Sequence, residues 1–129
     1  MRLFYIILFG VLGVLARYYT GLGITRNVST PFPLGTFLIN IVGAFVIGLI
    51  YVLGVEKAAI SEDLRIGIMV GFLGGFTTFS SYALEAARLL EQGEISTSML
   101  YLLLSPGLGL LAAFGGLFFA RTFIGGTGA

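Results

Sequence analysis

The residues best suited to binding chemistry lie in one stretch, residues 71–85, in the middle of an otherwise apolar run. Its sequence is Gly-Phe-Leu-Gly-Gly-Phe-Thr-Thr-Phe-Ser-Ser-Tyr-Ala-Leu-Glu. Glycine costs roughly 1 kcal/mol relative to alanine inside a helix, so the Gly74–Gly75 pair followed by Thr77–Thr78 marks a place where a helix could open. Within a membrane, an opened helix leaves carbonyls that only protein, water or an ion can pair with. The stretch therefore predicts a binding site at a broken helix.

Aromatic, hydroxyl and acidic side chains follow the predicted break. If the helix resumes there, Phe79 and Tyr82 are three residues apart and share one face. Ser80 and Ser81 lie between them, and Glu85 follows one turn later. We expect the aromatic pair to line one side of the resumed helix, with the carboxylate one turn further on.

The composition predicts an all-α membrane protein. The chain has 129 residues, of which 57% are hydrophobic and only 10% charged, whereas soluble domains average about 25% charged residues. At ~20 apolar residues per membrane span, four spans nearly use up the chain. We expect a single domain, residues 1–129, of four transmembrane helices with a break in the third. The expected spans cover residues 3–24, 34–55, 64–90 and 95–120.

Cysteine and histidine, which many catalytic sites use, are missing from the sequence. Their absence removes disulfides, thiol metal sites and the usual general base. We therefore expect no enzymatic activity. The apolar composition indicates membrane lipid as the surroundings, and we expect neither nucleic acid nor another kind of protein as a partner.

Polar side chains interrupt the first two spans. Asn40 is the only amide of the second span, and it either holds helices together or contacts an ion in a pore; the sequence favours neither. Arg17 falls inside the first span. An arginine at that depth either reaches the interface as an anchor or marks a polar cavity, and we favour the anchor.

The fourth span carries hydroxyl side chains and a proline. Tyr101 and Ser105 precede Pro106. Because proline has no backbone N–H, the carbonyl of Leu102 loses its regular helical donor.

The lysines and arginines are almost balanced between the two ends of the predicted bundle. Arg2, Lys57, Arg65 and Arg121 fall on the side of the termini, and Arg17, Arg26 and Arg88 fall on the other side. Orientation in a membrane normally follows a clear Lys/Arg excess in cytoplasmic loops. Either the first loop determines the orientation and the near balance of lysine and arginine is accidental, or the chain inserts in both orientations and pairs with an inverted copy of itself.

Several motifs resemble those of one known family. Residues 71–82, Gly-Phe-Leu-Gly-Gly-Phe-Thr-Thr-Phe-Ser-Ser-Tyr, resemble the third-span signature of the Fluc (CrcB) fluoride channels. Residues 35–40, Gly-Thr-Phe-Leu-Ile-Asn, are similar to the second-span motif of that family, and the spacing of Gly13 and Arg17 is similar to its first span. The resemblance covers essentially the whole chain.

The resemblance implies a dual-topology antiparallel homodimer in the cytoplasmic (inner) membrane. Such a protein is a fluoride-specific ion channel, which lets fluoride leave the cytoplasm passively and so limits fluoride toxicity. A structural sodium ion that is not transported would lie at the dimer centre. Matching positions assign this ion to the backbone carbonyls of Gly74 and Thr77.

The resemblance also implies a set of pore residues. By matching positions these are Asn40, Phe79, Tyr82, Thr36, Tyr101, Ser105 and Glu85. The sequence departs from the family at Tyr82, where phenylalanine is commonest, and at Gly109, where some members have a serine.

Alternatives from other classes of protein remain. A small four-span dual-topology multidrug exporter depends on an acid in its first span, and residues 3–16 contain none. In a structural membrane subunit without transport activity, the glycine and hydroxyl residues would only pack helices. Fluoride transport would distinguish a channel from both.

Overall fold

The chain is entirely helical between its loops, within the part that the computed structural model describes, residues 1–124. The last part of the expected domain, residues 125–129, lies outside the described residues. Four helical stretches are long and apolar enough to cross a membrane. The expectation of an all-helical, multi-pass membrane protein is therefore confirmed.

Each stretch begins and ends within a few residues of its expected span. The first is α1 (Arg2–Asn27), and the second joins α2 (Leu34–Tyr51) to the π-helical segment η1 (Val52–Glu56). The third comprises α3 (Glu62–Ile66), the π-helical η2 (Gly67–Phe72), α4 (Leu73–Phe76) and α5 (Phe79–Glu91). The fourth joins α6 (Ile95–Phe119) to the π-helical η3 (Ala120–Ile124).

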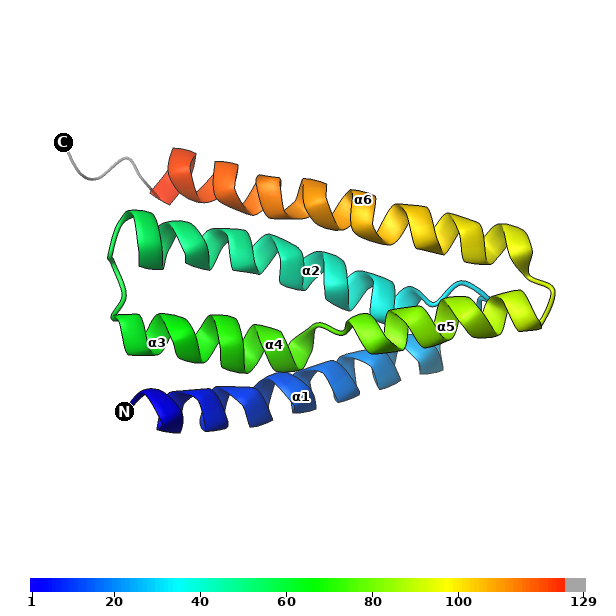
Figure 1. Cartoon of the computed structure of the whole chain (residues 1–129), viewed down its shortest axis with the longest axis horizontal. Helices are drawn as coiled ribbons and strands as arrows, with labels where there is room; N and C mark the ends of the chain where they lie inside the picture. Colours follow the sequence, from blue (N-terminus) through cyan, green and yellow to red (C-terminus); the bar gives the residue numbers. More distant parts are fainter. Residues whose placement is uncertain (125–129) are drawn as a thin grey trace.

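Consecutive stretches run in opposite directions, so the N-terminus and the end of η3 lie at the same end of the bundle (Figure 1). The loop between η1 and α3 is also at that end, and the other two loops are at the far end. The turn from α5 to α6 needs Gly93, whose φ of +79° is a conformation that residues with a side chain rarely adopt. Its N–H caps α5 by bonding the Leu90 carbonyl at 3.1 Å.

Glycines let the helices pack backbone against backbone. A methyl group added at Gly13 of α1 would overlap the carbonyl of Phe72 in η2, and one added at Gly75 of α4 would lie 2.8 Å from the Gly10 carbonyl. On the other side of the bundle, a methyl group at Gly116 of α6 would overlap the carbonyl of Phe45 in α2. Small residues allow such close approach, which stabilises helix pairs in lipid through dense packing.

The third stretch breaks at Thr77 and Thr78, not at the glycines. Gly74 and Gly75 stay helical in α4, whereas Thr77 (φ −84°, ψ 158°) and Thr78 (φ −152°, ψ 124°) are extended. β-Branched threonine suits an extended backbone. The hydroxyl of Thr78 caps α5 by accepting from the Ser81 N–H at 3.3 Å. The glycine pair thus serves close packing, and the threonine pair makes the break.

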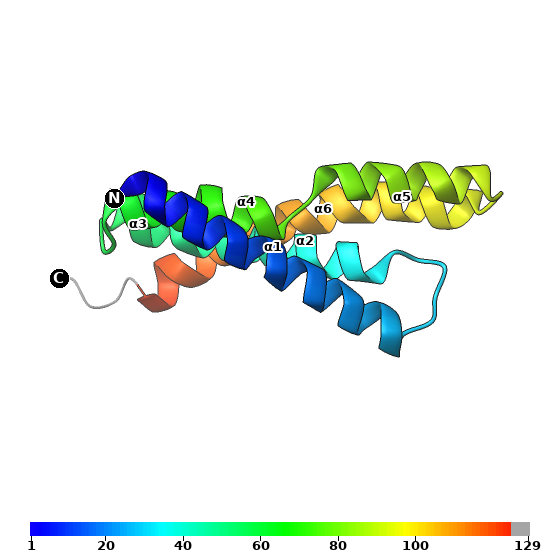
Figure 2. The same cartoon turned by 90° about the horizontal axis from the view of Figure 1, so that it is seen from below.

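The break shifts α5 sideways relative to α4. Seen from below, α5 and α6 run together, while the end of α1 and the start of α2 diverge from them (Figure 2). The break therefore lies where the two halves of the bundle separate.

Candidate functional site

Asn40 of α2 closes the break by pairing with the backbone of Thr78. Its Nδ2 donates to the Thr78 carbonyl at 2.9 Å, and its Oδ1 accepts from the Thr78 N–H at 2.9 Å. An asparagine amide has two N–H donors, so one remains beyond this pair of bonds. The amide does hold two elements together, as one of our interpretations expected, and its contact with a permeant ion stays a prediction.

The break redirects backbone donors away from their regular acceptors. In an uninterrupted helix the Thr78 N–H would bond the Gly74 carbonyl, but here it bonds Asn40. Likewise the Ser81 N–H, the regular partner of the Thr77 carbonyl, bonds the Thr78 hydroxyl. The carbonyls of Gly74 and Thr77 therefore lose their helical donors. They are the carbonyls to which the resemblance assigned the sodium ion.

Arg17 reaches the break from α1. Its Nε donates to the Gly75 carbonyl at 2.9 Å, and this carbonyl lies in the last turn of α4, where a positive charge is favoured by the helix dipole. The interfacial anchor that we favoured is therefore wrong, because the guanidinium is bonded to the break in the middle of the bundle. Arginine supplies the donor that the interrupted helix no longer provides.

A cavity of about 410 Å³ lies beside the break. Six of the predicted site residues line it: Asn40, Gly74, Thr77, Phe79, Tyr82 and Ser105. Among the described residues, none that lines this cavity carries a charge. The sequence places these residues on three different stretches, and the fold brings them to one surface.

Two residues of this cavity lack contacts within the described part of the chain: Ser105 lacks a hydrogen-bond partner, and Phe79 is largely exposed. The Ser105 hydroxyl is buried and has no hydrogen-bond partner among residues 1–124. Phe79 is 79% exposed, and its ring is tilted against that of Tyr82 with the centroids 5.7 Å apart. The expected shared face of Phe79 and Tyr82 is confirmed.

The remaining predicted residues form a hydrogen-bonded group around Glu85. The Thr36 hydroxyl donates to one carboxylate oxygen at 2.6 Å, and the Tyr101 hydroxyl donates to the other at 3.1 Å. Tyr101 is fully buried. These bonds tie α2, α5 and α6 together, and both oxygens of the carboxylate are used.

Tyr82 joins the cavity to the Glu85 group. Its ring packs edge-on against that of Tyr101, with the centroids 5.0 Å apart. Its hydroxyl donates to the Leu102 carbonyl at 2.8 Å. Tyr82 therefore connects the residues of the cavity with the hydrogen-bonded group of Thr36, Glu85 and Tyr101.

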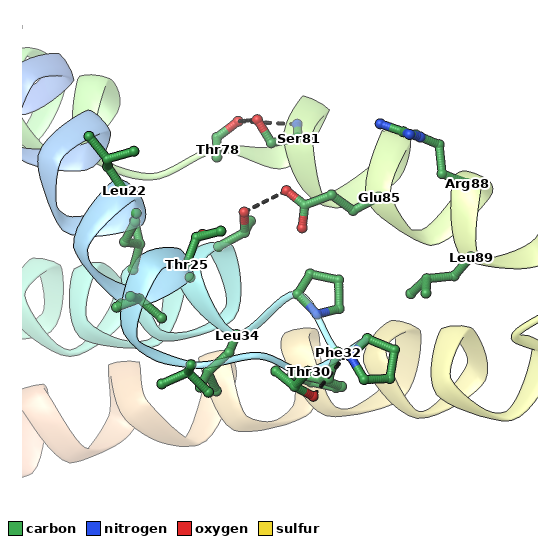
Figure 3. Close-up of a pocket in the computed structure, with 18 of the residues that line it drawn as sticks. Leu22, Thr25, Thr30, Phe32, Leu34, Thr78, Ser81, Glu85, Arg88 and Leu89 are labelled. Carbon is green, nitrogen blue, oxygen red and sulfur yellow. Dashed lines mark hydrogen bonds between the residues drawn. The ribbon is translucent and has the colours of Figure 1, made fainter. Parts of the chain in front are cut away.

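A second cavity, of about 580 Å³, opens where the two halves of the bundle diverge. Thr78, Ser81, Glu85 and Arg88 line it from the break and α5, and face the end of α1 and the start of α2 (Figure 3). Arg17 also lines this cavity. It contains the charges that the smaller cavity lacks, so the two cavities differ in their electrostatics.

The amino-acid sequence matches the family model described as CrcB-like protein, Camphor Resistance (CrcB), over residues 4–117. The chain belongs to the CrcB family. Several relatives carry the name Fluoride-specific ion channel FluC. The protein of Geobacter sulfurreducens is 41% identical over 116 residues, covering 90% of this chain and 94% of the relative. That of Geotalea daltonii is 45% identical over 113 residues, covering 82% and 91%. That of Citrifermentans bemidjiense is 42% identical over 120 residues, covering 93% and 97%.

The sequence of this CrcB chain placed Thr78 at the break, but Thr78 was not among the predicted site residues, although it organises the break. The Thr78 peptide pairs with Asn40, and the Thr78 hydroxyl caps α5. A threonine at the start of a resumed helix is a usual N-cap, which was the available indication. Gly109, the other departure from the family pattern, lines neither cavity of the single chain.

Proposed function

We propose that this CrcB chain is a fluoride-specific ion channel, which lets fluoride leave the cytoplasm passively across the inner membrane and so limits fluoride toxicity. The names of its relatives support this proposal. The observation that carries it is the buried, unpartnered hydroxyl of Ser105, in an uncharged cavity shared with Asn40 and Phe79. Conduction makes and breaks no covalent bond, so we propose no enzymatic activity.

The chemistry of the cavity suits a small, strongly hydrated anion. Removing such an ion from water is costly unless donors replace its hydration shell. The Ser105 hydroxyl and the second N–H of Asn40 are such donors. Aromatic rings have a positive edge, so Phe79 and Tyr82 add favourable contacts when their edges face the ion.

The absence of a cation among the described residues that line this cavity favours conduction over binding. An ion passes quickly only where its sites are weak and multiple, and a lysine or arginine would trap fluoride. Arg17 lies in the larger cavity and is bonded to the Gly75 carbonyl. We propose that its charge draws anions toward the break without entering the smaller cavity.

Glu85 has a positioning role in this proposal. A free carboxylate would repel fluoride, but both oxygens of Glu85 accept hydrogen bonds, from Thr36 and Tyr101. Those bonds hold two hydroxyl-bearing side chains beside the pathway. The hydroxyl protons of Thr36 and Tyr101 are already donated to Glu85, so we propose that the ion passes along the ring edges of this group rather than along its oxygens.

We propose that the channel is an antiparallel homodimer. In a single chain Gly74 and the ring of Phe79 are exposed, although the Gly74 carbonyl has lost its helical donor. Lipid cannot pair with such a carbonyl, so a second copy of the chain is the natural cover for this surface. The small difference in Lys/Arg between the two ends fits a chain that inserts in both orientations.

We propose that a structural sodium ion lies at the centre of this dimer. The carbonyls of Gly74 and Thr77 are free of their helical donors, and hard cations prefer oxygen ligands. Each copy would contribute this pair of carbonyls. The ion would offset the cost of opening the helix and would hold the two copies together.

Growth of a fluoride-sensitive bacterium that lacks its own fluoride exporter tests the proposed function. Expression of the wild-type chain is expected to restore growth in fluoride medium and to lower the fluoride content of the cells. A multidrug exporter or a structural subunit would leave both unchanged. Failure to restore growth by a chain shown to be in the inner membrane would contradict the proposal.

A further inference from the structure

Helix α6 contains one carbonyl whose regular donor is missing for a covalent reason. Pro106 lies inside α6 and has no N–H, so it cannot bond the Leu102 carbonyl one turn earlier. An unpaired carbonyl in a membrane helix is costly, and neighbouring side chains commonly restore the bond. Here the donor is the Tyr82 hydroxyl, which approaches the Leu102 oxygen to 2.8 Å.

The same tyrosine forms part of the cavity wall. Its ring lies between those of Phe79 and Tyr101, at centroid distances of 5.7 and 5.0 Å. Pro106 also lines the cavity. The Tyr82 side chain therefore extends from α5 into the cavity wall, and its hydroxyl is hydrogen-bonded to α6. A phenylalanine at this position would supply the ring but not the hydrogen bond to the Leu102 carbonyl.

We propose that the Tyr82 hydroxyl is a positioning group for the ion pathway: it bonds the carbonyl left free by Pro106 and so fixes the angle at which the Tyr82 ring edge meets the cavity. This inference rests on the proposed channel function. The two parts of the Tyr82 side chain then have different roles: the ring faces the ion, and the hydroxyl fixes the position of the ring. Tyr82 and Pro106 would then act as a pair, although they lie on different helices.

A double-mutant cycle tests the pairing by stability alone. The proteins are wild type, Tyr82→Phe, Pro106→Ala and the double variant, and the measurement is the apparent melting temperature in detergent. Alanine at position 106 restores a backbone N–H to the Leu102 carbonyl. Tyr82→Phe is therefore expected to lower the melting temperature by several degrees in the wild-type background and by much less in the Pro106→Ala background. Tyr19→Phe, the same change on an exposed ring, is the matched control and should have no effect.

Fluoride efflux from liposomes then separates positioning from simple helix repair. If the hydroxyl positions the ring, Tyr82→Phe still conducts, because the ring remains, but severalfold more slowly than wild type. Pro106→Ala should be slowed in the same way, because the hydroxyl loses its acceptor there, and the double variant should be no slower than either single variant. If the hydroxyl only satisfies the carbonyl, Pro106→Ala would conduct at the wild-type rate and would return the efflux of Tyr82→Phe to that rate. Such a rescue would overturn the positioning role.

The melting temperatures and the efflux rates test two separate claims, and either claim can be rejected without the other measurement. An equal loss of melting temperature in both backgrounds would overturn the pairing of Tyr82 with the Pro106 gap, whatever the chain transports. An unchanged efflux rate in Tyr82→Phe would also overturn the positioning role. Absence of fluoride efflux in the wild-type protein would instead reject the proposed function, together with the positioning role that rests on it, while the melting temperatures would still decide the pairing.

Discussion

At the scale of single residues, the break in the third stretch is held by side chains from distant parts of the chain. Asn40 pairs with the Thr78 peptide and Arg17 with the Gly75 carbonyl. The sequence marks both as exceptional, because each is a polar side chain in an apolar span. Their partners could not be predicted, since those depend on which helix faces reach the break.

Asn40→Asp is expected to abolish fluoride flux. The carboxylate places a negative charge in the path of an anion, and it cannot donate to the Thr78 carbonyl as the amide does. A lower melting temperature should accompany the loss, because the bond to this partly buried carbonyl contributes on the order of 1 kcal/mol. Asn27→Asp is the matched control, since that amide bonds the Gly23 carbonyl at the exposed end of α1. Near-normal flux in Asn40→Asp would reject the role of Asn40 in the pore.

Phe79→Ile tests whether ring edges contact the ion. Isoleucine keeps apolar bulk but lacks the positive ring edge, so most fluoride flux should be lost. The protein should remain folded, because the residue is 79% exposed in one chain and apolar swaps of similar volume usually cost less than about 1.5 kcal/mol. Fluoride efflux gives the answer, with gel filtration as the control for folding. Wild-type efflux in this variant would return Phe79 to a packing role.

At the scale of elements, hydropathy and turn residues were enough to predict the four helical stretches. The uncharged run of α2 and the polar residues of the loops leave little choice of boundary. The position of the break was harder to predict, because glycine has two uses. Gly75 lies against the backbone of Gly10 in α1, so this glycine serves helix packing, while the extended backbone begins at Thr77.

Gly13→Ala tests the close packing of α1 against η2. The added methyl group would overlap the Phe72 carbonyl, and forced repacking of this kind typically costs about 1–3 kcal/mol. The melting temperature should fall and fluoride efflux should decrease, because α1 carries Arg17 to the break. Gly23→Ala is the control on the same helix, where nothing lies within 4 Å of the added group; it should be neutral or slightly stabilising. Equal effects of the two changes would contradict the packing account.

At the scale of the whole molecule, the described fold widens the difference in positive charge between the two ends from one residue to two. Arg17 bonds to the break, so the count becomes four lysines and arginines at the end of the termini against two at the other end, Arg26 and Arg88. The sequence could indicate that orientation is weakly determined. It could not show how two copies meet, because the contacts of a dimer lie outside a single chain.

Added lysines in the loop between η1 and α3 should force one orientation of the whole molecule. A chain with a single orientation cannot form the antiparallel dimer, so growth in fluoride medium should fail. Co-expression with a copy biased the opposite way, by lysines in the loop between α1 and α2, should restore growth. Full resistance from one forced orientation alone would show that the antiparallel dimer is wrong.

The most direct test of the central claim is passive fluoride efflux from liposomes that contain only the purified wild-type protein. The vesicles are loaded with potassium fluoride or potassium chloride, and an ion-selective electrode records the release of each anion after valinomycin is added to carry compensating potassium. A fluoride channel predicts rapid fluoride release that begins with valinomycin, and retention of chloride in the matched vesicles. Retention of fluoride, or equal release of the two anions, would contradict the account.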